Sequence, residues 1–272
     1  MSVKNSKILL LLAAASLMFS ACEDTIPAGT ARYSPTTPPP PQRTVLIEEY
    51  TGTSCINCPN GHAVIEAIEN YYNTPENLLV GAGVLVVGIH IPNWGSPVEN
   101  GGLITPEASA IAPDGITPPQ ARINRSSGIL NRDKWTSTTA IYAAVAPSLT
   151  YPEGVSATES NDNITVKCRV SPSSNISDAR LHVWLVEDNI KKRQRLPDGS
   201  IDKEYIHNNV FRAAVTPVSG QAVNFVRNTD CSFEFNYPVN TAWKVDNMRA
   251  IVFIETASTG VINAAHGPVI SQ

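Results

Sequence analysis

The stretch Val45-Leu46-Ile47-Glu48-Glu49-Tyr50, with Cys55-Ile56-Asn57-Cys58-Pro59 shortly after it, decides the fold of the first half of the chain. The first stretch has the apolar composition of a buried strand, and Gly61 to Tyr72 has helical periodicity. The two cysteines therefore lie at a strand-to-helix turn, where free backbone N–H groups and the helix dipole stabilise a thiolate. This predicts a redox site with Cys55 as the nucleophile and Cys58 as the resolving thiol.

Strands and helices alternate from Arg43 to about Pro147. A continuously apolar strand is predicted at Val84 to Ile89, a short strand after Pro118-Pro119, and a helix from Asp133 to Val145. Such alternation predicts a central sheet with flanking helices. Together with the Cys-x-x-Cys, it predicts an α/β domain of the thioredoxin-like type over residues 43–150.

Pro119 is the candidate substrate-binding residue. In thioredoxin-like proteins a cis-proline packs against the Cys-x-x-Cys, and Gly115-Ile116-Thr117-Pro118-Pro119 resembles that segment in order and position. No acidic residue stands at an obvious position to deprotonate Cys58. The Glu48-Glu49 pair is expected to be two ordinary surface or strand-edge carboxylates, because nothing places them around a shared site.

The second half of the chain has the pattern of an all-β domain. Alternating apolar residues at Ile164 to Val170 and Leu181 to Val186, followed by further short strands, predict an antiparallel β-sandwich over residues 151–272. Cys168, Trp184 and Cys231 resemble the immunoglobulin-like arrangement, in which a tryptophan packs on a disulfide between two sheets. His207 to Arg212 is expected to form a loop against this sandwich.

The first residues predict export. Lys4 and Lys7 precede an apolar run, and small residues precede Cys22, so residues 1–21 are predicted to be a lipoprotein signal peptide with Cys22 as the lipidated N-terminus. The alternative is an ordinary secretory signal with an unmodified Cys22. Residues 22–42 carry six prolines and should form an extended tether. The protein would thus be held at a membrane by its lipid.

The net charge bears on the binding partners of the protein, and the spacing of the cysteines bears on its disulfides. Removal of Lys4 and Lys7 with the signal leaves 18 of 20 basic side chains against 24 acidic ones, a formal charge of −6. Nucleic acid is therefore not expected as a partner. In an oxidising compartment the i, i+3 spacing favours a disulfide between Cys55 and Cys58, which leaves Cys168 to pair with Cys231.

Two histidines allow a different chemistry. His62 follows Cys58 by four residues on the predicted helix, and His90 ends the second strand at the same sheet edge as Cys55. Either histidine with the two cysteines could bind Zn or Cu(I). The simpler interpretation, that His62 is a solvated helix residue and His90 a loop-entry residue, is favoured, and no cofactor is expected.

The order of these motifs resembles the outer-membrane-protein-28-type lipoproteins of Bacteroidetes. The resemblance rests on four segments that cover nearly the whole mature chain: Glu48 to Gly52, Cys55 to His62, Pro119 to Arg125 and Tyr205 to Ala213. It implies a lipid-anchored outer-membrane protein, on the periplasmic or the cell-surface side, with a thioredoxin-like domain followed by a β-sandwich. It implies little biochemistry beyond surface-antigen or adhesin roles.

Two main hypotheses follow. The protein is a thiol-disulfide oxidoreductase acting on protein thiols or disulfides, or a non-catalytic binding lipoprotein in which Cys55 and Cys58 form a structural disulfide. A Cu- or Zn-handling protein is a further alternative.

Overall fold

The protein is mostly β-structure. The computed structural model describes residues 43–79 and 82–271; the predicted signal peptide (1–21), Cys22 and the predicted tether (22–42) lie outside the described residues. The strands in the described part are β1 (Thr44–Thr51), β2 (Gly83–His90), β3 (Gln120–Ile123), β4 (Leu130–Asn131), β5 (Leu149–Thr150), β6 (Val155–Ser160), β7 (Asn163–Pro172), β8 (Ile176–Glu187), β9 (Ile190–Lys191), β10 (Gln194–Arg195), β11 (Ile201–Asp202), β12 (Ile206–His207), β13 (Val210–Ala214), β14 (Gln221–Phe225), β15 (Cys231–Pro238), β16 (Met248–Thr256) and β17 (Gly260–Ser271). The helices there are α1 (Cys58–Tyr72), α2 (Pro75–Leu79), α3 (Ala108–Ile111) and α4 (Trp135–Ala143), with 3₁₀ turns at Val98–Asn100, Arg132–Lys134 and Val245–Asn247.

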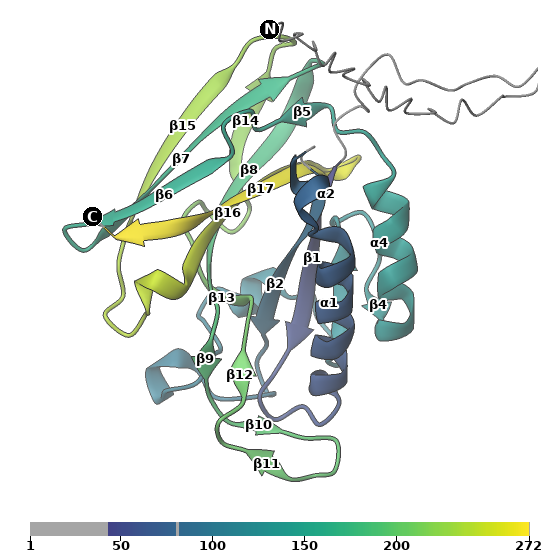
Figure 1. Cartoon of the computed structure of the whole chain (residues 1–272), viewed down its shortest axis with the longest axis vertical. Helices are drawn as coiled ribbons and strands as arrows, with labels where there is room; N and C mark the ends of the chain where they lie inside the picture. The colour runs from purple at the N-terminus through teal and green to yellow at the C-terminus, as the bar shows by residue number, and fades with distance from the viewer. Residues whose placement is uncertain (1–42, 80–81, 272) are drawn as a thin grey trace, which may run out of the picture. The chain divides into compact units, whose positions relative to one another are not determined.

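One large mixed sheet organises the described residues. Its strand order is β15-β7-β6-β17-β16-β8-β13-β2-β1-β3-β4, with β14 added beside β8 and β5 beside β7. The pairs β1·β2, β13·β2 and β17·β6 are parallel, and the other pairs are antiparallel. Two small ribbons, β10–β11 and β12–β9, lie beside this sheet (Figure 1).

The end of the sheet formed by β1, β2 and β3 carries two helices. Figure 1 shows α1 and α4 side by side; α1 contacts β2 and α4, and α4 contacts β1 and β3. Apolar side chains of β1, β2 and β3 form one core cluster with Ile65 and Ile68 of α1 and Trp135 of α4. The buried positions of α1, which are Cys58, Gly61, Ile65 and Ile68, recur at helical spacing, so the periodicity of the sequence explains which face is covered.

The remaining strands enclose a second core. It is built from the inward side chains of β6, β7, β8 and β16, with Phe233 and Phe235 of β15 packed against it. Strand β7 alternates buried and less buried residues along most of its length, as expected for a strand with one covered face. The second half of β8 is buried at every position because the sheet is covered on both faces there.

The sheet continues through both predicted domains. Strand β13 pairs with β2 through Val210 and Gly88, and the Gly88 N–H donates to Asn209 O at 2.7 Å. Strand β2 belongs to the first predicted domain and β13 to the second. The division near residue 150 stays a prediction.

The expectation for Glu48 and Glu49 was wrong, because both side chains are buried. Neighbouring residues of a strand point to opposite faces, and both faces of β1 are covered. Glu48 pairs with Arg122 at 2.9 Å and Arg125 at 2.8 Å. Burial alone would raise the pKa of Glu48, but the two guanidinium groups outweigh burial and lower the pKa. Arg125 also reaches Glu255 of β16 at 2.6 Å, which links distant strands.

Candidate functional site

Cys55 and Cys58 form a disulfide at the start of α1. The Sγ atoms are 2.18 Å apart, the Cα atoms 5.4 Å apart, and the cysteines are only 1% and 0% exposed. Cys58 is the first helical residue and Pro59 follows it, where a missing N–H costs no helical hydrogen bond. The strand-to-helix placement predicted from the sequence is therefore present.

The loop before β3 packs against this disulfide. The Pro118–Pro119 peptide bond is cis, and Cys55 Sγ lies 3.4 Å from Pro118 O. A disulfide sulfur carries no hydrogen, so this is a contact in the oxidised state; a reduced Cys55 could donate to the same oxygen. A Cβ added to Gly61 would lie 2.9 Å from Pro119 Cβ, so glycine is required for α1 to approach the proline.

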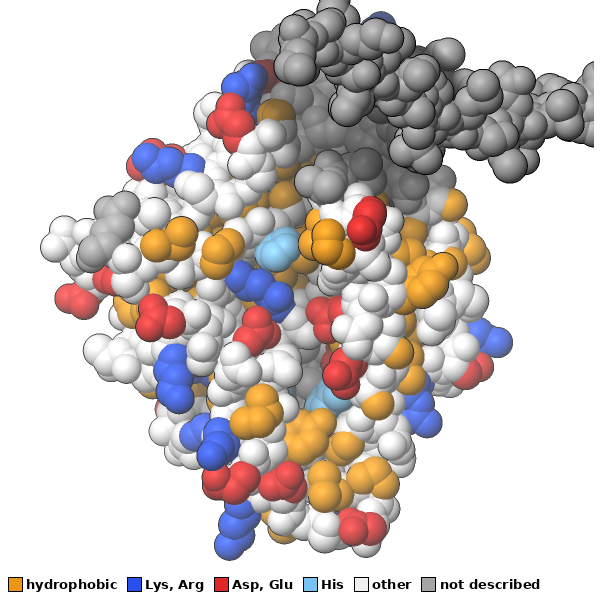
Figure 2. Space-filling view, in the orientation of Figure 1, with side chains coloured by type: hydrophobic (Ala, Val, Ile, Leu, Met, Phe, Trp, Pro, Cys, Tyr) orange, Lys and Arg blue, Asp and Glu red, His pale blue; other side chains and the backbone are white. Residues whose placement is uncertain are grey.

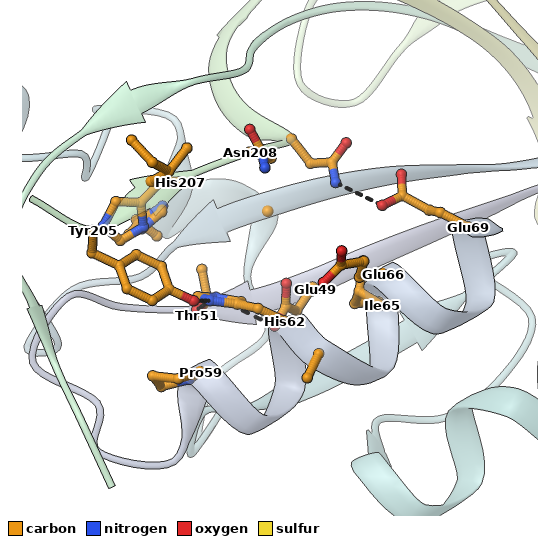
Figure 3. Close-up of a pocket in the computed structure, with 15 residues that line it drawn as sticks. Glu49, Thr51, Pro59, His62, Ile65, Glu66, Glu69, Tyr205, His207 and Asn208 are labelled. Carbon is orange, nitrogen blue, oxygen red and sulfur yellow. Dashed lines mark hydrogen bonds and ion pairs between the residues drawn. The ribbon is translucent and has the colours of Figure 1, made fainter.

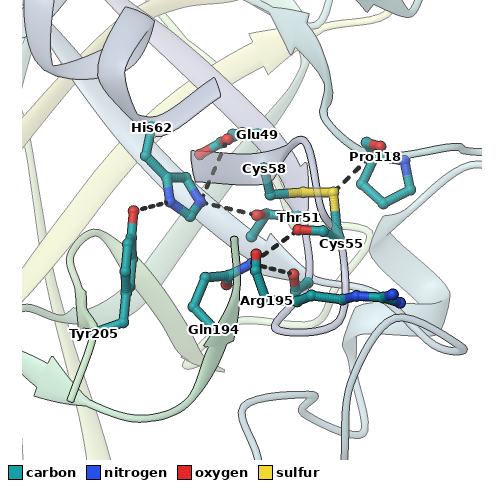
Figure 4. Close-up of a disulfide and its surroundings, with 10 residues drawn as sticks. Glu49, Thr51, Cys55, Cys58, His62, Pro118, Gln194, Arg195 and Tyr205 are labelled. Carbon is teal, nitrogen blue, oxygen red and sulfur yellow. Dashed lines mark hydrogen bonds and ion pairs between the residues drawn. A yellow bond between two sulfur atoms is a disulfide. The ribbon is translucent and has the colours of Figure 1, made fainter. Parts of the chain in front are cut away.

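A segment from the second half of the chain covers the disulfide loop. Gln194 is fully buried, and its Nε2 donates to Cys55 O at 2.9 Å and to Gly52 O at 3.4 Å. The Arg195 N–H donates to Thr53 O at 2.9 Å. Figure 4 shows Gln194 and Arg195 against the loop that carries Cys55. The β10–β11 ribbon therefore restricts access to the first cysteine.

Glu49 is the acidic residue that sequence reasoning did not find. It is 3% exposed on the α1 side of β1, and its Oε1 would lie 3.0 Å from a Cβ on Gly61. Oε1 has no hydrogen-bond partner among the described residues and lies 3.8 Å from His62 Nε2. Burial, with a smaller contribution from Glu69, raises the pKa of Glu49 to about 8, so the carboxyl is mostly protonated at pH 7.

His62 is part of a hydrogen-bonded group and not a solvated helix residue. Its Nε2 is 3.0 Å from Thr51 Oγ1, and its Nδ1 is 2.8 Å from Tyr205 OH (Figure 4). Burial, with a contribution from His207, lowers the pKa of His62 to about 4. The imidazole is therefore neutral at physiological pH and can accept one hydrogen bond while it donates another.

His90 is buried at the end of β2, where the sequence placed it. Its ring centroid lies 5.4 Å from that of His207, and burial lowers the pKa of His90 well below its ordinary value. Cys55 and Cys58, the two candidate cysteine ligands, are bonded to each other in the disulfide and are therefore not thiolates that could bind a metal ion. Over residues 43–79 and 82–271, no three His, Cys, Asp or Glu side chains are arranged to hold a metal ion.

Comparison with known proteins identifies the family. The model of the outer membrane protein Omp28 family matches residues 113–269, which is more than half of the chain. The chain belongs to the Omp28 family. Its outer-membrane location, predicted from the sequence, is that of the family. No helix in the described part of the chain is both long and apolar enough to span a membrane. A search of curated proteins finds no match.

Solved structures add a likeness in fold. HBP35 of Porphyromonas gingivalis matches with a TM-score of 0.65 at 13% identity, over 84% of this chain and 76% of that one. A domain of the outer membrane lipoprotein Omp28 from the same organism matches with a TM-score of 0.34 at 18% identity, over 47% of this chain and 93% of that domain.

The predicted disulfide between Cys168 and Cys231 is not formed in this Omp28-family chain. Both thiols are free. Cys168 of β7 stands opposite Phe233, and Cys231 of β15 stands opposite Val170, so the two cysteines are diagonal neighbours. Diagonal Cα atoms on antiparallel strands lie about 7–8 Å apart, beyond the usual reach of a disulfide.

His207 to Arg212 do not form a loop against the sandwich, so that expectation was wrong: residues 210–212 lie in strand β13, which pairs with β8, and His207 belongs to the site with Tyr205. Strand β12 places His207 against His90, and Tyr205 binds His62. Sequence reasoning also missed Gln194. All three residues come from more than 130 positions beyond Cys55, and no local pattern marks a contact at that distance.

Proposed function

We propose that this Omp28-family protein is a cell-envelope thiol-disulfide oxidoreductase. In this proposal residues 43–150 form a thioredoxin-like domain, residues 151–272 form an immunoglobulin-like β-sandwich, and lipid on Cys22 holds the protein at the outer membrane. The observation that carries the proposal is the Cys55–Cys58 disulfide at the start of α1, with Pro118 O against Cys55 Sγ and the uncharged Glu49 beneath the first helical turn.

The exchange moves two electrons and two protons. A substrate thiolate attacks one sulfur of the disulfide, which forms a mixed disulfide and releases the other cysteine as a thiolate. A second substrate thiolate then attacks the mixed disulfide, so the substrate leaves oxidised and Cys55 and Cys58 are left reduced. In the reverse direction Cys55 attacks a substrate disulfide and Cys58 resolves the mixed disulfide.

The surrounding groups supply the rest of the chemistry. The N-terminus of α1 stabilises a thiolate on Cys55. Glu49 has a pKa of about 8, close to that of a thiol, so the fraction of Glu49 that is ionised would accept the proton of Cys58 during resolution. Pro119 would contact the backbone of the bound substrate next to Cys55.

A second candidate function is supported by the burial of the disulfide. Cys55 is 1% exposed beneath Gln194 and Arg195, as expected for a structural bond in a binding lipoprotein. Under this alternative the β10–β11 ribbon would stay in place and thiol exchange would be slow.

The reduction potential separates the two candidates. Redox titration of the full-length protein in detergent, with thiol trapping, should use a Cys168→Ala, Cys231→Ala background so that free thiols do not interfere. A midpoint between about −270 and −120 mV would support the oxidoreductase. A midpoint below about −300 mV would refute it in favour of the structural disulfide. In an oxidoreductase Cys58→Ser should also trap mixed disulfides, and Cys55→Ser should trap none.

A further inference from the structure

A pocket of about 300 Å³ lies between α1 and the segment around β12, and its lining includes Pro59, the residue that follows Cys58. Figure 3 shows side chains from both segments pointing into it, and Figure 2 shows this face hollowed, with acidic side chains and an imidazole along the hollow. Its rim is exposed at Ala63, Glu66, Ile206 and Asn208, and its floor is buried. The proposed redox step uses one group of its lining, Glu49, and leaves the rest of the pocket without a role.

The floor holds polar groups without well-formed hydrogen bonds. Glu49 is 3% exposed, His90 4% and His207 2%, and Glu49 Oε1 has no hydrogen-bond partner among the described residues. The two imidazole rings make no well-formed hydrogen bond there and meet only backbone groups, of Gly88 for His90 and of Lys192 and Arg193 for His207. Buried polar atoms are nearly always hydrogen-bonded, because leaving one unpaired is unfavourable. Three such side chains around one pocket point to a polar ligand.

The acidic groups of the lining favour a cation, which on binding would stabilise the ionised form of Glu49 over the protonated form that burial favours in the empty pocket. The pocket is lined by three acidic side chains, Glu49, Glu66 and Glu69, and by no lysine or arginine. Its histidines are neutral because burial lowers their pKa, to about 4 for His62 and His207. Two arginines lie near the pocket without lining it: Arg249 binds Asn209 and Asp188, and Arg212, which pairs with Glu187, adds to the effect of burial in lowering the pKa of His90. A neutral imidazole offers one acceptor nitrogen, so the floor can accept several hydrogen bonds from one cation.

The walls of the pocket favour an organic cation over a metal ion. Pro59 and Ile65 of α1 and Ile206 of β12 also line the pocket, so part of its wall is apolar. The ring of Tyr205 adds an aromatic face that attracts organic cations. A bare metal ion is less suited, because His62 already uses both ring nitrogens and no three ligand side chains in the described part of the chain converge on a metal position.

We infer that the pocket binds a primary alkylammonium group, with the alkyl stem along Ile65 and Ile206 and the ammonium group among Glu49, His90 and His207. The group is either a small free amine or a lysine side chain of a peptide, which have the same chemistry. The ammonium donates three hydrogen bonds, and the floor supplies acceptors that otherwise have no donor. The inference does not depend on thiol exchange, since the pocket is complete with the disulfide intact.

The test measures binding to the full-length oxidised protein in detergent by titration calorimetry. n-Pentylamine and the peptide acetyl-Gly-Lys-Gly-amide serve as the two probes, with 1-pentanol and the norleucine peptide as uncharged controls. We expect at least one charged probe to bind at least about tenfold more tightly than its control, because charged hydrogen bonds are the stronger ones. The stronger probe identifies the source of the ammonium group.

Variants locate the site. Glu49→Gln and His207→Ala should each weaken binding by about tenfold or more, whereas Glu76→Gln on the exposed face of α2 should not change it. If His207→Ala does not fold, N-acetylation of pentylamine removes the charge from the ligand side and must abolish binding. Equal binding of charged and uncharged probes would overturn the inference. So would Zn²⁺ binding that is lost in His207→Ala without any amine binding.

Discussion

Replacement of Glu49 by glutamine should change how stability depends on pH. Glu49 is buried, and burial together with Glu69 raises its pKa from 4.5 to about 8. Between these values the folded state holds a proton on this carboxyl that the unfolded state has released. Stability must therefore fall as pH rises through this range, since stability rises with pH only where the unfolded state binds more protons. Glutamine has nearly the same shape and does not titrate.

The size of the effect follows from one proton. One proton bound only in the folded state changes the free energy of unfolding by about 1.4 kcal/mol per pH unit. The slope becomes smaller as pH approaches the pKa of the folded state. Between pH 6 and pH 8 the natural protein should therefore lose about 2 kcal/mol in its free energy of unfolding relative to Glu49→Gln. His62 and His207 titrate in both proteins, so their contribution cancels in the difference.

Urea unfolding at pH 6, 7 and 8 measures this difference directly. The measurement compares the free energies of unfolding of the natural protein, Glu49→Gln and the surface control Glu76→Gln. The comparison requires that the slope of this free energy against urea concentration is the same for all three. The control should follow the natural protein at each pH. Parallel pH dependence of the natural protein and Glu49→Gln, within about 0.5 kcal/mol, would mean that Glu49 is ionised in the folded state, and the proton-acceptor role argued for it would fail.

Three further outcomes test other contacts. Gln194→Ala should speed reduction of the disulfide by dithiothreitol about fivefold, because it removes a hydrogen bond worth about 1 kcal/mol; an unchanged rate would mean that the ribbon does not control access. Arg125→Met should cost about 3–5 kcal/mol in urea unfolding by leaving Glu48 short of a partner, and a loss under 1 kcal/mol would contradict the buried network. In the native protein a thiol reagent should label the partly exposed Cys231 and not the buried Cys168, whose pKa burial raises to about 12; equal labelling would exclude this arrangement.

The local parts of this site could be predicted from the sequence. The Cys-x-x-Cys lies between a buried strand and a helix because both elements have clear periodicity within a few residues of the cysteines. The helix begins at Cys58, three residues before the predicted Gly61, since Pro59 is favourable in a first turn. Strand β2 matches the continuous apolar run to within a residue at each end.

The parts that could not be predicted depend on contacts between distant segments. Gln194 and His207 carry no local signal for burial, because each is buried by packing against the first half of the chain. The burial of Glu49 could have been inferred. A strand that lies between two neighbours and beneath a helix has no solvated face, so both residues of the Glu48-Glu49 pair had to be buried.

The two adjacent buried glutamates differ in charge state: Glu48 is ionised and paired, whereas Glu49 is mostly protonated. This difference indicates a structural role for Glu48 and a functional role for Glu49. Glu48 is held charged by Arg122 and Arg125, which tie β1 to the rest of the sheet. Glu49 has no arginine partner, remains mostly protonated at pH 7, and lies between the disulfide helix and the pocket. A buried acid without a partner lowers stability, and a strongly shifted pKa beside a cleft is typical of functional sites. In the two proposals, thiol exchange and ammonium binding would both use this one carboxyl group, so a cation in the pocket would favour its ionised form, which is the form that can take a proton from Cys58.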